Sequence, residues 1–169
     1  MITLILNHDV DFSQAPQQDQ AAFSGPPTRT VFQAHDTIYR IVSIRDVEYS
    51  DGTVGGNSLF DSPWWIPAHT FREITMRAHR TRQPLIAVAR SGLAVMREFN
   101  PHMDWIAVVK MKSPAYGWVG KTAPQPEFRD DSQVWLMGGL EQIWLPGLAP
   151  RGQTTSPHAY IDYFGSFEP

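Results

Sequence analysis

The sequence predicts an α+β fold with a mainly antiparallel sheet, because helix-like and strand-like patterns occupy different parts of the chain. In the middle third, between residues 68 and 99, apolar residues recur at spacings of three and four, which is typical of helices with one buried face. Short runs of β-branched and aromatic residues, separated by Pro, Gly and Asp clusters, fill most of the rest. Consecutive strands without intervening helices favour antiparallel pairing.

The first third of the chain combines an unpatterned segment with one clear strand. Residues 9–30 are rich in Gln, Pro, Ala and Ser and show no hydrophobic period, so we expect a loosely structured arm on the surface. The segment TIYRIVSI, residues 37–44, is a β-branched and aromatic strand that contains Arg40. A turn or hairpin is expected over residues 48–58, where Asp-Gly and Gly-Gly pairs occur.

The middle third predicts two helices. Pro67 suits a helix N-terminus, and Phe71, Ile74 and Ala78 share one face of a helix expected over residues 68–82. Residues 85–99 also fit helical spacing, up to the Asn-Pro pair that follows. A strand over the apolar run LIAVA is the alternative, because periodicity does not distinguish the two for short runs.

The last third predicts a series of strands, at residues 105–112, 116–121, 132–139, 141–146 and 159–167. Tryptophans are frequent here and just before the first helix, where Trp64 and Trp65 are adjacent. Neighbours on an extended chain point in opposite directions, so one of these two is expected to face outward.

Composition limits the class of protein. A chain of 169 residues suits a single domain, 1–169, and a net charge of −3 argues against nucleic acid or an anionic membrane as partner. The absence of cysteine excludes disulfides, thiol catalysis and cysteine-bound zinc. The opening MITLIL is too short for a signal peptide or a membrane span, so we expect a soluble protein, cytoplasmic as made.

Most familiar catalytic motifs are absent from the sequence. There is no G-x-x-x-x-G-K-[ST], G-x-G-x-x-G or G-x-S-x-G pattern. His8, Asp9 and Asp11 form the one cluster with metal-ligand chemistry, and we expect exposed charges there rather than a metal site. A metal-dependent hydrolase built on His8 and Asp9 is kept as an alternative.

Three separated segments together resemble one superfamily. HDTIYRIVS places Arg40 after an aromatic residue in an early strand, and YGWVGKTAPQP is a strand that runs into a G-x-x-A-P-Q turn. MGGLEQIWLPG carries Glu141 and Gln142 directly after a double glycine and Leu140. Residues 35–145 thereby resemble the ADP-ribosyltransferase-like fold, and within it NAD-hydrolysing toxin domains of the tuberculosis necrotizing toxin kind. The resemblance implies two small, mainly antiparallel sheets that form an NAD cleft.

The same resemblance implies the chemistry and the site. Cleavage of the nicotinamide–ribose bond of NAD builds positive charge on the ribose carbon, which a carboxylate or amide oxygen stabilises. Arg40 would hold the pyrophosphate as a guanidinium fork. Catalysis is assigned to Gln142, Glu141 and Arg40, and no metal is expected. Binding of NAD is assigned to a flat aromatic wall and the adjacent backbone, namely Tyr39, Arg40, Trp64, Trp65, Trp118, Gly138 and Gly139.

Alternation along a strand puts Glu141 and Gln142 on opposite sides, so only one enters the cleft. The position in the motif favours Gln142, whereas cation stabilisation favours Glu141. The alternatives to an NAD glycohydrolase of toxin or effector type are a mono-ADP-ribosyltransferase with a macromolecular acceptor, and a non-catalytic binding module of phage or secretion origin. A toxin of this kind implies delivery into another cell and an immunity protein as partner. In a non-catalytic module, Arg40 would be a structural ion-pairing residue.

Overall fold

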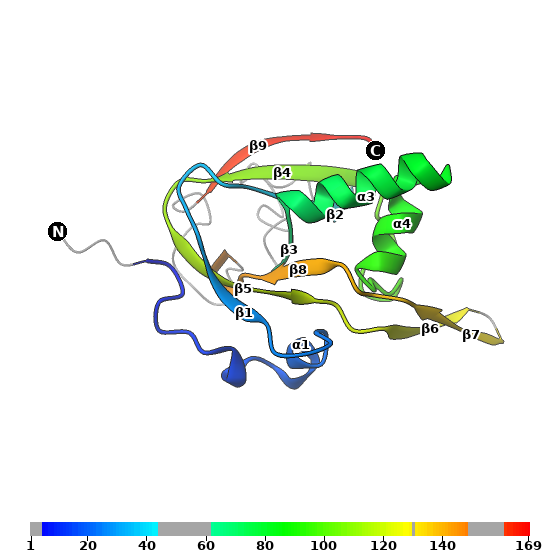
Figure 1. The fold of residues 1–169 in the computed structure, drawn as a ribbon, viewed down its shortest axis with the longest axis horizontal. Helices are drawn as coiled ribbons and strands as arrows, with labels where there is room; N and C mark the ends of the chain where they lie inside the picture. Colours follow the sequence, from blue (N-terminus) through cyan, green and yellow to red (C-terminus); the bar gives the residue numbers. More distant parts are fainter. Residues whose placement is uncertain (1–4, 44–61, 130, 149–160) are drawn as a thin grey trace, which may run out of the picture.

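The computed structural model describes residues 5–43, 62–129, 131–148 and 161–169, and these form an α+β fold (Figure 1). Seven strands make one antiparallel sheet in the order β1-β5-β8-β3-β2-β4-β9, and β6 and β7 make a separate hairpin. The predicted fold class is confirmed. The strands are β1 (Thr28–Phe32), β2 (Thr37–Val42), β3 (Trp64–Pro67), β4 (Trp105–Met111), β5 (Ala115–Lys121), β6 (Gln125–Arg129), β7 (Ser132–Leu136), β8 (Glu141–Trp144) and β9 (Ile161–Phe167). The helices are α1 (Gln17–Gln20), α3 (Ala68–Thr81) and α4 (Leu85–Gly92), with 3-10 turns η1 (Phe12–Gln14) and η3 (Pro146–Leu148).

The large sheet has two parts that meet at a short ladder. β2 pairs with β4 over six positions but with β3 over two, Ile38 with Pro67 and Tyr39 with Ile66. Strands β1, β5, β8 and β3 lie on one side of this junction, and β2, β4 and β9 lie on the other. The resemblance implied two small sheets, whereas the structure has one continuous seven-stranded sheet and a separate two-stranded hairpin. Arg40 is the first residue of β2 beyond the junction.

Apolar side chains on the two faces of the sheet belong to two different core clusters. Ile38, Trp65 and Ile143 belong to the first, on one face of their strands. Ile66 lies on the opposite face and packs with Ile74 of α3 in the second cluster. Helices α3 and α4 cover this second face, and Ile41, Ile66, Leu93 and Met103 of the second cluster also line a cavity.

The two predicted helices are present, and the second is shorter than expected. α3 ends with Arg82 in the left-handed region, at φ 55°. The run LIAVA is helical, as the first half of α4, which settles the helix–strand alternative. The helix stops at Gly92 rather than near residue 99, because Ala94 adopts a left-handed φ of 51° and turns the chain. The segment after α4 is thus free to form the wall of a cavity.

The expectation of a loosely structured arm over residues 9–30 is corrected by the structure. This segment contains η1, α1 and the start of β1, which pairs with β5 over five positions. Phe23 is 6% exposed and packs edge-to-face against Phe12, in a cluster with Trp118 and Trp144. Isolated aromatic residues anchor this segment, and they give no periodic signal in the sequence.

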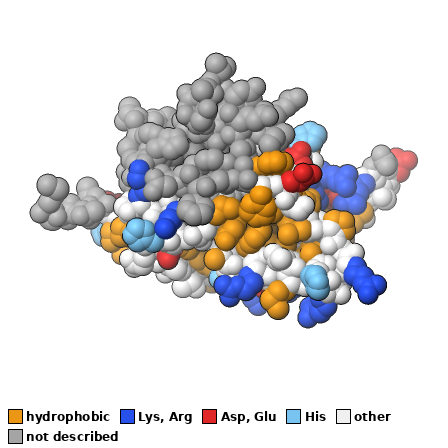
Figure 2. All heavy atoms as spheres, turned by 90° about the horizontal axis from the view of Figure 1, so that it is seen from above, with side chains coloured by type: hydrophobic (Ala, Val, Ile, Leu, Met, Phe, Trp, Pro, Cys, Tyr) orange, Lys and Arg blue, Asp and Glu red, His pale blue; other side chains and the backbone are white. Residues whose placement is uncertain are grey.

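The predicted turn over residues 48–58 lies outside the described residues. None of the described helices is long and apolar enough to cross a membrane. Figure 2 shows apolar side chains gathered in the middle of the face seen from above, with basic side chains around them.

Candidate functional site

The candidate site is a cavity of about 910 Å³, whose volume falls within the range of small-molecule sites. Its walls come from α1, the end of β2, the start of β3, the segment after α4, the turn after β5, and β8. We call it the Gln142 cavity. Arg40 and Gln142, predicted from distant parts of the sequence, both line it, together with Trp64.

Arg40 reaches the Gln142 cavity from the point at which β2 and β3 stop pairing. Its Nη1 lies 3.3 Å from the Ser62 carbonyl oxygen, to which it donates, and its guanidinium carbon lies 5.6 Å from the centre of the Trp65 ring. Alternation along β2 puts the Arg40 side chain on the same face of the sheet as Ile38 and Val42. The Gln142 side chain lies on the opposite face, the face of Ile66. The splaying of the two half-sheets, and not a shared strand face, therefore brings Arg40 to the cavity.

Gln142 lines the cavity because its neighbours fix the register of β8. Ile143 and Leu145 are fully buried in the core, which turns Gln142 and Trp144 to the other side. The Gln142 residue is 9% exposed. Its polar atoms are not among the fully buried atoms that lack a partner, and the residue lines the cavity, so its carboxamide can reach a bound molecule.

Glu141 lies outside the cavity. It pairs with Lys121 across the β5–β8 ladder, and its carboxylate bonds to Nε2 of His69 at the start of α3. Both side chains are partly exposed, at 40% for Glu141 and 58% for His69. This carboxylate is thus occupied by a surface histidine on the opposite side of β8 from Gln142.

The double glycine has a structural role in the turn before β8. Gly138 has a φ of +65°, and a Cβ added there would lie 2.6 Å from the Thr122 carbonyl oxygen. The Gly138 amide donates to Ser91 of α4 and the Gly139 amide to Thr122, both at 2.9 Å. Neither glycine lines the cavity. The two amides hold the turn against α4 and the residue that follows β5. The turn thereby fixes the start of β8, whose second residue is Gln142.

The predicted aromatic residues separate into one that lines the cavity and three that do not. Trp64 lines the cavity whereas its neighbour Trp65 is fully buried, so the two point in opposite directions as predicted. Tyr39 stacks on Phe71 at 4.2 Å between ring centres, on the helix-covered face. Trp118 is 4% exposed, with its ring edge-to-face against another tryptophan.

Sequence reasoning missed the contribution of the N-terminal segment. Asp19 of α1 lines the cavity and accepts a hydrogen bond from Nε1 of Trp144 at 3.0 Å. Trp144 is the second tryptophan of the cavity wall and pairs with Trp64 across the β3–β8 ladder. Nothing local in the arm indicates this contact, because it joins residues 125 positions apart. Asp19 and Arg40 are the charged side chains among the described residues that line the cavity.

The turn after β5 supplies two more polar residues. Thr122 and Gln125, both within the G-x-x-A-P-Q turn, line the cavity. The Thr122 hydroxyl donates to the carbonyl oxygen of Gly92 at 3.0 Å and ties the turn to α4. The sequence motif predicts this turn, but it does not assign Thr122 or Gln125 to the site. Asn100 lines the cavity as well, and its carboxamide donates to the Ile41 carbonyl oxygen.

The described residues contain no group of three or more His, Asp or Glu side chains that could hold a metal ion. Nδ1 of His8 and Oδ1 of Asp9 are 2.8 Å apart on an exposed surface. Asp11 instead accepts the backbone N–H of Ser13 at the start of η1, and this bond lowers the pKa of its carboxyl group. The cluster is explained by local capping and pairing.

Comparison with known proteins gives one distant similarity. No family model and no curated protein matches the chain. Among solved structures, the chain is similar to one in the structure of Tne2 in complex with Tni2. The identity is 15%, the similarity covers 74% of this chain and 85% of that chain, and the TM-score is 0.49.

Proposed function

We propose that the protein is an NAD glycohydrolase that cleaves the nicotinamide–ribose bond in the Gln142 cavity. The observation that carries the proposal is that Arg40 and Gln142 line one cavity although they belong to different halves of the sheet. The sequence resemblance independently assigns both residues to an NAD site. Their convergence is what such a site requires.

The roles of the residues follow from the chemistry of the bond. Arg40 provides a guanidinium fork for the pyrophosphate, whose negative charge it complements. We assign the Gln142 carboxamide oxygen to stabilising the positive charge that develops on the ribose carbon as nicotinamide leaves. Trp64 and Trp144 supply apolar walls against which a flat ring can pack.

The position of Glu141 favours hydrolysis over transfer to a macromolecule. Its carboxylate is directed to His69 and lies outside the cavity lining, so of these two neighbours only the Gln142 amide faces the cavity. The carboxylate pattern typical of protein-modifying transferases, E-x-E or Q-x-E, is replaced by L-E-Q in this sequence. We include in this proposal that the protein acts as a toxin or effector and pairs with an immunity protein. The sequence resemblance alone supports these two parts.

The test is direct. Purified protein is incubated with NAD, and free nicotinamide and ADP-ribose are measured with and without a cell lysate as a source of acceptors. Equal amounts of both products, unaffected by the lysate, support hydrolysis. Nicotinamide release with ADP-ribose attached to lysate macromolecules would favour the transferase, and no release at all would contradict the enzyme hypothesis.

A further inference from the structure

A second cavity, of about 640 Å³, lies between α4, the segment after residue 97, and the β6–β7 hairpin. Arg40 and Gln142 do not line it. Three arginines do, Arg90, Arg97 and Arg129, and we call it the arginine cavity.

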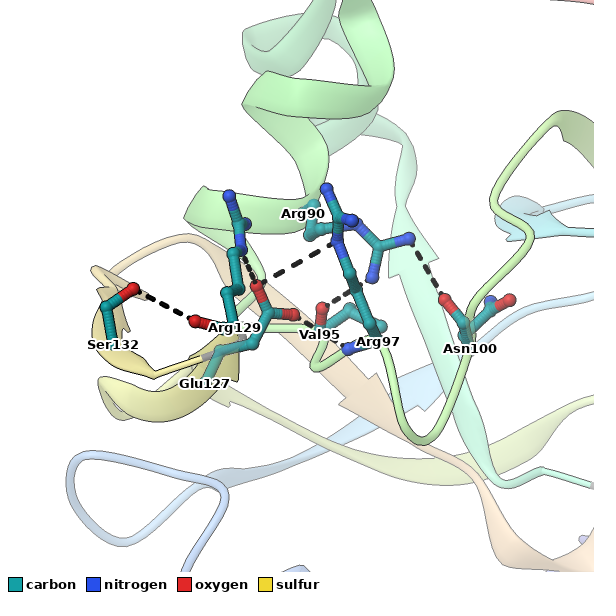
Figure 3. Close-up of polar contacts among 7 residues, drawn as sticks. All are labelled: Arg90, Val95, Arg97, Asn100, Glu127, Arg129 and Ser132. Atoms are coloured by element: carbon teal, nitrogen blue, oxygen red, sulfur yellow. Dashed lines mark hydrogen bonds and ion pairs between the residues drawn. The ribbon is translucent and has the colours of Figure 1, made fainter.

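A buried carboxylate holds two of the three arginines (Figure 3). Glu127 is 4% exposed, and its two oxygens accept the backbone N–H of Arg97 at 2.8 Å and Nε of Arg129 at 2.6 Å. Burial acts to raise the pKa of Glu127, but these two bonds and the neighbouring positive charges outweigh it, so the pKa lies below its ordinary value. Glu127 is therefore ionised and offsets one of the three positive charges.

The positive charge of Arg90 is held in place without being neutralised. Arg90 is 8% exposed, and its two terminal nitrogens donate to the carbonyl oxygens of Val95 and Asn100, each at 3.0 Å. Burial lowers the pKa of Arg90 while the charge of Glu127 raises it, and a guanidinium stays protonated under both influences. Carbonyl oxygens satisfy its N–H groups but contribute no formal negative charge.

The outer two arginines are available to a ligand. Arg97 is 61% exposed at its side chain, and its Nε is 4.0 Å from Glu127 Oε2, beyond hydrogen-bond distance. Figure 3 shows the guanidinium groups of Arg97 and Arg129 on either side of the Glu127 carboxylate, both pointing toward α4. Asp104 also lines the cavity. Three guanidinium groups are thus set against two carboxylates, and positive charge is in excess.

We propose that the arginine cavity binds the phosphoryl group of a small phosphate ester. Guanidinium forks match the oxygens of a phosphoryl group, and the excess of positive charge attracts its negative charge. Ile86 and Trp135, the latter 56% exposed, form an apolar wall for a flat organic group.

The experiment measures binding of inorganic phosphate and phenyl phosphate by calorimetry and by the rise in melting temperature, at constant ionic strength. The test variant is Arg97→Gln, which removes an exposed guanidinium but keeps the backbone N–H that Glu127 accepts. Its matched control is Arg80→Gln, the same change at an exposed position of α3 outside both cavities. We expect Arg97→Gln to weaken binding of both anions about tenfold, and Arg80→Gln to leave it unchanged.

Further arms identify the ligand and separate this proposal from NAD cleavage. Phosphate binding that persists in Arg40→Ala belongs to the arginine cavity, whether or not NAD is cleaved. Tighter binding of phenyl phosphate, reduced by Trp135→Ala, indicates an aromatic ester, whereas equal affinity for the two probes indicates free phosphate. The proposal is overturned if neither anion binds, or if Arg97→Gln binds both as tightly as Arg80→Gln does.

Discussion

The two cavities share Met103 in their walls but differ in how they carry charge. The Gln142 cavity has one arginine and one aspartate, set among tryptophans and carboxamides. The arginine cavity has three guanidinium groups around a buried glutamate. A neutral carboxamide is suited to stabilising charge that appears only during a reaction, whereas a fixed excess of charge is suited to holding an anion in its ground state. We therefore expect mutations in the first cavity to act on turnover and mutations in the second to act on binding and stability.

The largest effect is expected at Gln142. Gln142→Ala removes the carboxamide from the wall of the cavity, and loss of a contact made in the transition state typically costs about a hundredfold or more in rate. Nicotinamide release at saturating NAD measures it, with folding checked by circular dichroism. Glu141→Ala is the matched control, because Glu141 is adjacent in sequence and lies outside the cavity lining. An inactive Glu141→Ala with a nearly normal Gln142→Ala would reverse the assignment.

The next largest effect is expected at Arg40. Arg40→Ala removes a charge-assisted contact to the pyrophosphate, worth about 1.5–3 kcal/mol, so NAD affinity falls more than tenfold. The expected result is a higher KM with a smaller change in kcat. Melting curves provide the control, because Arg40 also donates to Ser62 and lies over Trp65. A melting temperature far below that of the parent would show that Arg40 is structural.

The sequence predicted the parts of the site that depend on local pattern. The register of β8 follows from Ile143 and Leu145, whose apolar side chains must be buried, and this places Gln142 on the opposite side. The sequence could not show that β2 and β3 pair over two positions and then diverge, which is what brings Arg40 to the cavity. Alternation along β2 by itself puts the Arg40 side chain on the same face as the core residue Ile38, away from the cavity.

Contacts between distant segments were beyond prediction. Glu127 and Arg129 are two residues apart on one face of β6, which in the sequence is an ordinary pattern of exposed charges. The bond from the Arg97 amide, in the segment after α4, is what distinguishes Glu127. Asp19 likewise lies in a segment without periodicity, and its partner Trp144 is in the last third of the chain. The double glycine was assigned to NAD binding from the motif, whereas the structure uses Gly138 for a close approach to Thr122.

A smaller effect, on stability, is expected at Glu127. Glu127→Gln keeps the shape of the side chain but removes the charge that Arg129 and the Arg97 amide stabilise, at a cost of about 1–3 kcal/mol in the free energy of unfolding at pH 7. The pKa of Glu127 is lower in the folded than in the unfolded protein, so this contribution is present above the ordinary value of 4.5 and is lost as the pH falls through the folded-state pKa. Urea unfolding at pH 7 and pH 3 should show parent and variant converging at the lower pH. A difference that is the same at both pH values would contradict this origin.

The smallest effect is expected where the N-terminal segment meets the Gln142 cavity. Asp19→Ala removes the acceptor for Nε1 of Trp144, a partly buried hydrogen bond worth about 1 kcal/mol, and should lower the free energy of unfolding by that amount. Because the same bond fixes a wall of the cavity, KM for NAD should rise a few-fold while kcat changes little. Asp9→Ala is the control, since the Asp9 side chain is 90% exposed and outside the cavity. Trp144→Phe removes the donor and keeps an aromatic ring, so the double variant should cost less than the two single changes added together. Full additivity would mean that the bond contributes nothing and that other contacts of the segment, such as those of Phe12 and Phe23, hold it in place.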